Sequence, residues 1–99
     1  MTKIDISTLS SLLACKANKH NFNKLWNSLD ENYRVRIAEN PLTPTDILRI
    51  LSTDKVWYVR ESVAKNPSAT IDILKKLVND LDFYVKARAA RNPNLVNKL

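Results

Sequence analysis

Glycine is absent from the 99 residues of this chain. Phosphate-binding loops, such as the P-loop and the dinucleotide fingerprint, need glycine where the backbone approaches phosphate or adopts a positive φ. Tight two-residue hairpins depend on it as well. The sequence therefore excludes these nucleotide-binding motifs, and it favours short helices joined by corners built from Asn, Pro and Ser.

Cysteine and histidine each occur once, as Cys15 and His20. A single cysteine forms neither an intrachain disulfide nor a cysteine-based metal cluster, which fits a reducing compartment. His20 has no second histidine to complete a metal site, and Cys15 has no evident base partner. We therefore expect no enzyme activity, no metal, no cofactor and no small-molecule substrate.

Long apolar runs are also missing, because no stretch approaches the roughly 18 residues that a membrane span needs. The first residues lack the basic head and unbroken apolar core of a secretory signal. Hydrophobic residues make up 44% and charged residues 26% of the sequence, which is ordinary for a globular protein. We expect a single domain over residues 1–99, located in the cytoplasm and without a membrane partner.

What the sequence does contain is one segment that occurs three times. It runs from Val59 to Pro67, and its copies are residues 33–41 and 85–93. Every copy ends in Asn-Pro, and the three Asn-Pro pairs lie 26 residues apart. Between residues 28–53 and 54–79, eight of 26 aligned positions are identical. A fixed period of this length predicts a repeat protein.

Apolar residues recur at helical spacing within each copy, and every Asn-Pro should end a helix because proline disfavours the α conformation before it. One further helix of about two turns should start at Pro44, with Thr43 as its N-cap. The other predicted helices cover residues 4–18, 21–29, 30–39, 56–65, 70–78 and 80–91. The repeats are then a degenerate one over 1–27, full ones over 28–53 and 54–79, and a truncated one over 80–99 that lacks its second helix.

A single helix pair cannot bury its apolar face, so the sequence predicts an all-α fold in which helix pairs stack into a short α-solenoid. The pattern formed by Asp54, Val59-Arg60, Val63-Ala64, Asn66-Pro67, Asp72, Leu74 and Leu77 resembles the leucine-rich-repeat variant, a bacterial relative of HEAT repeats. The resemblance covers residues 28–99 and implies an interaction scaffold rather than one activity. The iron–sulfur cluster of a founding member is not implied, because Cys15 is alone.

The formal net charge is +6, and the positive charge is concentrated in the second half. Residues 51–99 hold nine Lys and Arg against five Asp and Glu, and residues 83–99 contain no acid. Such a basic end attracts acidic partners, whether nucleic acid or an acidic protein face.

Arg34, Arg60 and Lys86 occupy the same position in successive copies. Together with Arg36, they could form a basic stripe that follows a phosphate backbone. The resemblance to HEAT-like repeats implies an alternative, which we favour for the three equivalent residues: they pair with acids at the preceding corners. Those acids are Asp30, Asp54 and Asp80.

Two aromatic pairs, Trp57-Tyr58 and Phe83-Tyr84, precede the second and third copies. Because neighbouring residues on a helix point in different directions, we expect Trp57 and Phe83 to seal the core and the two tyrosines to reach the surface. Core packing and solvated charge are the plain alternatives for all such residues. The candidate partner-binding residues are Tyr58, Lys65, Tyr84, Arg88 and Arg91.

The leading hypothesis is a non-catalytic binding module, an adaptor or inhibitor that binds an acidic protein through the basic surface of its second and third repeats. A second hypothesis is nucleic-acid binding, with the basic stripe on phosphates and Tyr58 and Tyr84 stacking on bases. A third is self-association through the exposed end of the truncated repeat.

Overall fold

The computed structural model describes residues 28–97, and in that range it contains six helices and no strand. The prediction of an all-α fold is confirmed for these residues. The helices predicted over 4–18 and 21–29, and the degenerate repeat over 1–27, lie outside the described residues. The described helices are α3 (Glu31–Glu39), α4 (Thr45–Leu51), α5 (Trp57–Lys65), α6 (Ile71–Leu77), α7 (Phe83–Arg91) and α8 (Pro93–Val96).

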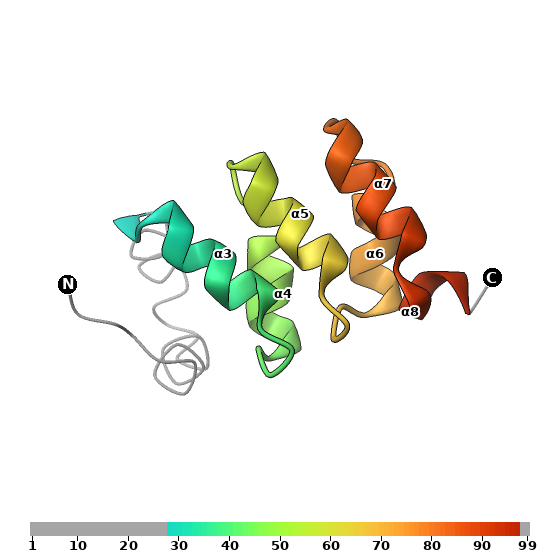
Figure 1. The fold of residues 1–99 in the computed structure, drawn as a ribbon, viewed down its shortest axis with the longest axis horizontal. Helices are drawn as coiled ribbons and strands as arrows, with labels where there is room; N and C mark the ends of the chain where they lie inside the picture. Colours follow the sequence, from blue (N-terminus) through green and yellow to red (C-terminus); the bar gives the residue numbers. More distant parts are fainter. Residues whose placement is uncertain (1–27, 98–99) are drawn as a thin grey trace.

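Three nine-residue helices lie side by side in one row, in which α5 contacts both α3 and α7 (Figure 1). The shorter helices lie behind this row, with α4 against α3 and α5, and α6 against α5 and α7. Each helix of the row begins 26 residues after the one before it, and α6 begins 26 residues after α4. The sequence period is therefore also the period of the helices.

The core lies between the row and the shorter helices, and it is made of aliphatic residues at helical spacing. Complete burial of such a side chain stabilises the fold by roughly 1.5–3 kcal/mol. Two of the core positions of α5 are Val59 and Val63, both 0% exposed. The remaining fully buried large aliphatic residues are Ile47, Leu48, Leu51, Leu74, Leu77 and Val85.

Each helix of the row ends at an asparagine that precedes a proline. Asn40, Asn66 and Asn92 all have extended backbone conformations, with ψ between 121° and 127°. A residue before proline is held out of the α region, so the helix cannot continue. The predicted helix ends are confirmed. No residue between 28 and 97 has a positive φ, so these corners need no glycine.

The predicted N-cap at Thr43 is wrong. Its hydroxyl donates a hydrogen bond of 2.6 Å to the carbonyl oxygen of Ile37, near the end of α3, and α4 begins only at Thr45. Thr43 is buried in this arrangement. Its side chain therefore closes the corner by pairing a helix-end carbonyl rather than by starting the next helix.

The third copy begins and ends differently from the prediction. α7 starts at Phe83 instead of Asp80, because the side chain of Asp82 accepts hydrogen bonds from the backbone N–H groups of Tyr84 and Val85 and caps the helix there. The one-turn helix α8 was not predicted, and it occupies the corner that follows Asn92 rather than the place of α4 and α6.

The helices that the structure describes include none long and apolar enough to cross a membrane.

Candidate interaction surfaces

Two arginines of the row form ion pairs with the next helix pair along the chain. Arg34 Nε lies 2.8 Å from Asp54 Oδ2, and the two side chains are only 3% and 0% exposed. Arg60 repeats this contact with Asp80, again at 2.8 Å. The expected pairing of these arginines with acids is confirmed, but the partner assignment is wrong, because the acid belongs to the following corner. Asp30 instead caps α3, accepting a hydrogen bond of 2.7 Å from the N–H of Asn32.

These ion pairs are part of a continuous network. Arg60 also donates a hydrogen bond of 2.6 Å to the backbone oxygen of Asp54, whose carboxylate binds Arg34. Burial favours a higher pKa for Asp80, but the hydrogen bonds from Arg60 and the N–H of Asp82, with the charge of Arg60, hold the pKa below its usual value. A buried charge that loses such a partner is strongly destabilising. Arg34 and Arg60 are therefore engaged within the fold, which removes them from the surface expected to contact phosphates.

Two buried asparagines join successive helices of the row. Asn66 Nδ2 donates to the carbonyl oxygens of Ala38 and Asn40, at 2.7 and 2.9 Å. Asn92 makes the same pair of contacts one repeat later, at 2.8 and 3.0 Å. Sequence reasoning treated these asparagines as helix stops and missed their role between helices. The signal was available, because proline alone is enough to end a helix, and yet an asparagine precedes it at all three corners.

Four aromatic side chains at the starts of α5 and α7 form the aromatic cluster, which comprises Trp57, Tyr58, Phe83 and Tyr84. The ring centroids of Trp57 and Tyr84 are 5.6 Å apart with an interplanar angle of 28°, so the rings stack across the two helices. Edge contacts within each sequence pair, at 5.5 and 5.9 Å, complete the cluster. Such arrangements are typical of favourable aromatic pairs.

The prediction of which aromatic residues are buried is wrong for Trp57, Phe83 and Tyr58, and it is confirmed for the exposed Tyr84. Trp57 is 41% and Phe83 74% exposed, whereas Tyr58 is half-buried and packs against the core. Trp57 lies two residues before the buried Val59, about 200° away around the helix, so it points outward. A hydrogen bond to the carboxylate of Glu31, followed by desolvation and the charge of that carboxylate, raises the pKa of Tyr58. Tyr84 is 57% exposed.

A second exposed set lies in the last turns of the row and forms the basic face, which comprises Arg36, Lys65, Arg88 and Arg91. Arg88 Nε of the basic face lies 3.4 Å from Glu61 Oε2, and this ion pair joins α7 to α5. Because Arg88 is half exposed, this ion pair adds little to stability. Positive charge at a helix C-terminus also favours the helix dipole, so part of the basic face has a structural explanation.

The structure brings some of the predicted partner-binding residues together and separates others. Tyr84 and Arg88 are one turn apart on the exposed side of α7, and Arg91 follows one turn later. Tyr58 and Lys65 lie near opposite ends of α5.

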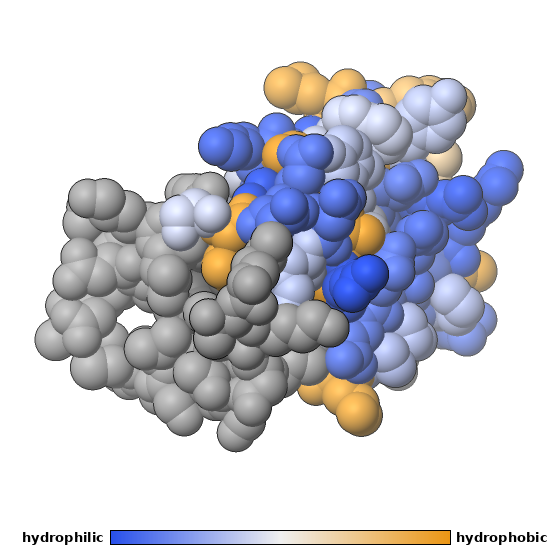
Figure 2. All heavy atoms as spheres, turned by 60° about the vertical axis from the view of Figure 1, so that its left-hand side comes forward, coloured by the Kyte–Doolittle hydropathy of each residue, from blue (hydrophilic) through white to orange (hydrophobic). Residues whose placement is uncertain are grey.

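Figure 2 shows hydrophobic atoms along the top of the molecule, the side on which α5 and α7 begin in Figure 1, with hydrophilic atoms below them.

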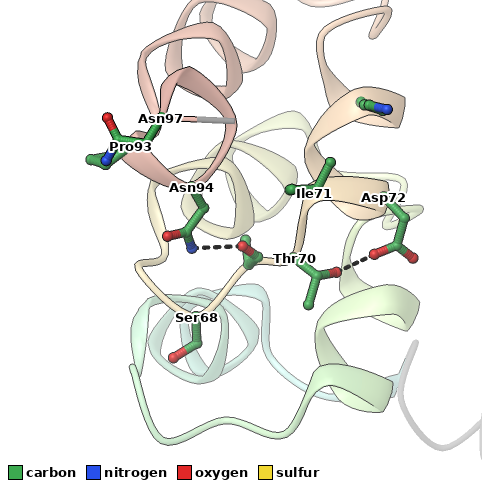
Figure 3. A pocket seen from close by; sticks show the side chains of 9 residues that line it. Ser68, Thr70, Ile71, Asp72, Pro93, Asn94 and Asn97 are labelled. Atoms are coloured by element: carbon green, nitrogen blue, oxygen red, sulfur yellow. Dashed lines mark hydrogen bonds between the residues drawn. The ribbon is translucent and has the colours of Figure 1, made fainter. Parts of the chain in front are cut away.

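Another exposed feature is an open depression between the start of α6 and α8 (Figure 3). Its polar groups are mostly bonded within the chain: Thr70 donates to Asp72, and Asn94 donates to the carbonyl oxygens of Pro67 and Ala69 at 2.6 and 2.8 Å. The hydrogen bond from Thr70 opposes desolvation and lowers the pKa of Asp72. These contacts fasten the corner, and we assign no ligand to the depression.

Within residues 28–97, no three His, Cys, Asp or Glu side chains gather as a metal ion would require. His20 and Cys15 lie outside this range. Comparisons with protein-family models, with curated proteins and with solved structures find no match to this chain.

Proposed function

We propose that the chain is a HEAT-like helical repeat module of the leucine-rich-repeat-variant type, a short α-solenoid that works in the cytoplasm by binding another protein. The ion pair of Arg34 and the contact of Asn66 with an alanine carbonyl each recur 26 residues further along the chain. This recurrence supports the repeat assignment. The exposed tyrosine and arginine side chains of α7 suit binding to another protein, and the proposed role is that of an adaptor or inhibitor.

The observation that carries this proposal is the exposed stripe of α7 that contains Tyr84, Arg88 and Arg91. Tyrosine, tryptophan and arginine are the residue types enriched at the energetic centres of protein interfaces. Trp57 extends the stripe onto α5 through its stacking on Tyr84. The positive charge of the basic face matches a partner with an acidic surface and would speed its association.

Nucleic-acid binding is a weaker candidate, because two of its four proposed phosphate contacts, Arg34 and Arg60, hold carboxylates inside the fold. Arg36 and Lys86 remain exposed. The aromatic cluster favours this alternative to some degree, since exposed aromatic rings can stack on bases.

The proposal is tested by capturing partners from the source cells with the full chain and with a variant that carries Arg88→Glu and Arg91→Glu. A matched control carries Lys75→Glu and Lys76→Glu, which reverse two exposed charges on α6. We expect the same acidic protein to be captured by the wild type and the control and lost with the double reversal on α7. Capture that the α7 reversals leave unchanged would contradict the proposed surface.

A parallel titration of the chain into labelled single-stranded and duplex DNA at low salt tests the alternative of nucleic-acid binding. Binding driven by phosphate contacts is strongest there and weakens steeply as salt rises. We expect no binding that depends on Arg88 or Arg91. Tight, salt-sensitive binding lost in the same double variant would favour nucleic acid over protein.

A further inference from the structure

The two interfaces between neighbouring helices of the row have contacts at the same three pairs of positions. An arginine binds an aspartate 20 residues later. An asparagine side chain donates to the carbonyl oxygen of an alanine 28 residues earlier. The first residue of one helix contacts a tyrosine 27 residues later: Glu31 forms a hydrogen bond with Tyr58, and Trp57 stacks on Tyr84. The α3–α5 and α5–α7 interfaces therefore share one register.

α7 has an aromatic residue, a basic residue and an alanine at these three positions, as α5 does. We call Phe83, Lys86 and Ala90 the end face, because each lies 26 residues after the residue that makes the contact on α5. Phe83 is 74% exposed, and Lys86 and Ala90 are exposed too. Ala64, the counterpart of Ala90, is 0% exposed. The end face is thus a copy of a covered surface that nothing within residues 28–97 covers.

The polar groups of the end face lack the partners that their counterparts have. Among residues 28–97, Lys86 forms no ion pair, and the carbonyl oxygen of Ala90 accepts no hydrogen bond. Burial and Arg60 have the largest effects on the pKa of Asp80. The charge of Lys86 also lowers that pKa, but it is the smallest of the causes. Lys86 therefore has a positive charge available at the position where the arginines bind carboxylates.

We infer that the end face is a docking surface for a helix pair of a partner protein that continues the register of this chain. The partner supplies a carboxylate to Lys86, a side-chain amide to the carbonyl oxygen of Ala90, and an aromatic ring to Phe83. Charge complementarity selects the carboxylate, and the two covered interfaces define where each group must lie. This surface is distinct from the basic face of the proposed function, so either can fail without the other.

A second copy of this chain fits the end face less well. The residue that occupies the carboxylate position one repeat before Asp54 is Ser28, and Asp54 and Asp80 already bind arginines. Two end faces placed against each other would bring two Lys86 side chains together, and like charges across an interface are unfavourable. A heterologous acidic partner is therefore the occupant that the charges favour.

The test uses a labelled synthetic peptide with the sequence of residues 74–99 as the probe and the full chain as the receptor. Residue 74 would follow residue 99 in the 26-residue period, so a docked peptide presents its Asp80 to Lys86 of the chain and its Asn92 to Ala90. We expect saturable binding by fluorescence anisotropy. Lys86→Glu in the chain should weaken it by about tenfold or more, as expected for the loss of one charge-assisted hydrogen bond.

A charge exchange makes this test specific. A peptide that carries Asp80→Lys should bind the Lys86→Glu chain better than it binds the wild type. The matched control is Lys75→Glu, which reverses an exposed lysine on α6 and should leave peptide binding unchanged. Equal binding of the original peptide to the wild-type and Lys86→Glu chains would overturn the inference.

Because a free peptide can fail to fold, the same 26 residues are also appended in register after residue 99 of the full chain. We expect the extension to raise the urea midpoint of unfolding and to slow amide exchange along α7, and we expect Lys86→Glu to remove most of that gain. An extension that changes neither property overturns the inference. Sedimentation that shows a dimer of the unextended chain, lost with Lys86→Glu, would also overturn it, by assigning the end face to a second copy.

Discussion

The face of α5 that meets α7 and the end face of α7 carry equivalent residues, yet the first is covered within the described chain and the second is not. On α5, Arg60 holds Asp80 at 2.8 Å, and Ala64 is fully buried. On α7, Lys86 and Ala90 are exposed. The difference between these two faces shows that equivalent residues can be buried in one repeat and exposed in the next. The carboxylate that pairs with Arg60 and the helix that covers Ala64 both belong to the next helix pair, so the effect of these positions depends largely on what lies against them.

The largest expected effect is the loss of the more deeply buried ion pair. Asp54→Ala leaves the Arg34 guanidinium buried without its carboxylate, and we expect a loss of about 3–5 kcal/mol in the free energy of unfolding. Asp80→Ala should cost less, because Arg60 and Asp80 are 18% and 10% exposed. Urea unfolding followed by circular dichroism measures both. A larger loss in the free energy of unfolding for Asp80→Ala than for Asp54→Ala would contradict this ranking of the two ion pairs by burial.

The asparagine contacts should have the next largest effect. Asn66→Ala removes the donor that serves the carbonyl oxygens of Ala38 and Asn40. We expect a loss of about 1–3 kcal/mol, the usual result of leaving buried polar groups unpaired. Asn79→Ala is the control, because Asn79 is exposed and bonds only within its own turn. Equal stabilities of the two variants would contradict a role between helices.

A smaller effect should appear as a dependence on pH. The folded-state pKa of Asp80 is lowered, so its contribution to stability is complete above the usual value of 3.8 and is lost as the pH falls through the lowered value. We expect the urea midpoint of the wild type to fall with acidification below about pH 4, and to fall less in Asp80→Asn. Parallel acid profiles for the two proteins would show that Asp80 is not the group responsible.

Much of the fold could be predicted from the sequence, because the period, the apolar spacing and the Asn-Pro stops are local signals. The ends of α3 and α5 follow directly from Asn40-Pro41 and Asn66-Pro67. The start of α4 could not be predicted as well, since the hydroxyl of Thr43 bonds to Ile37 rather than to the helix that follows it. Where a threonine hydroxyl can form a hydrogen bond with either of two nearby backbone groups, tertiary packing decides which bond forms.

The candidate surfaces were harder to predict, because they depend on how one repeat meets the next. Pairing each arginine with the acid of its preceding corner, as the resemblance to HEAT-like repeats implies, gave the wrong partners for Arg34 and Arg60, whose carboxylates come from 20 residues further on. Trp57 and Phe83 were assigned to the core by hydrophobicity, whereas the positions of the buried valines turn them outward. Helix phase relative to the core would have given the correct answer.

The most direct test of this account compares the same substitution on the covered and the uncovered face. Arg60→Met and Lys86→Met are made in the full chain, and the urea midpoints of unfolding are measured side by side. We predict a loss of about 1.5–3 kcal/mol for Arg60→Met, the usual contribution of a hydrogen bond to a charged group, and no measurable change for Lys86→Met. Equal losses at the two positions would contradict the claim that these residues act mainly through the helix pair that covers them.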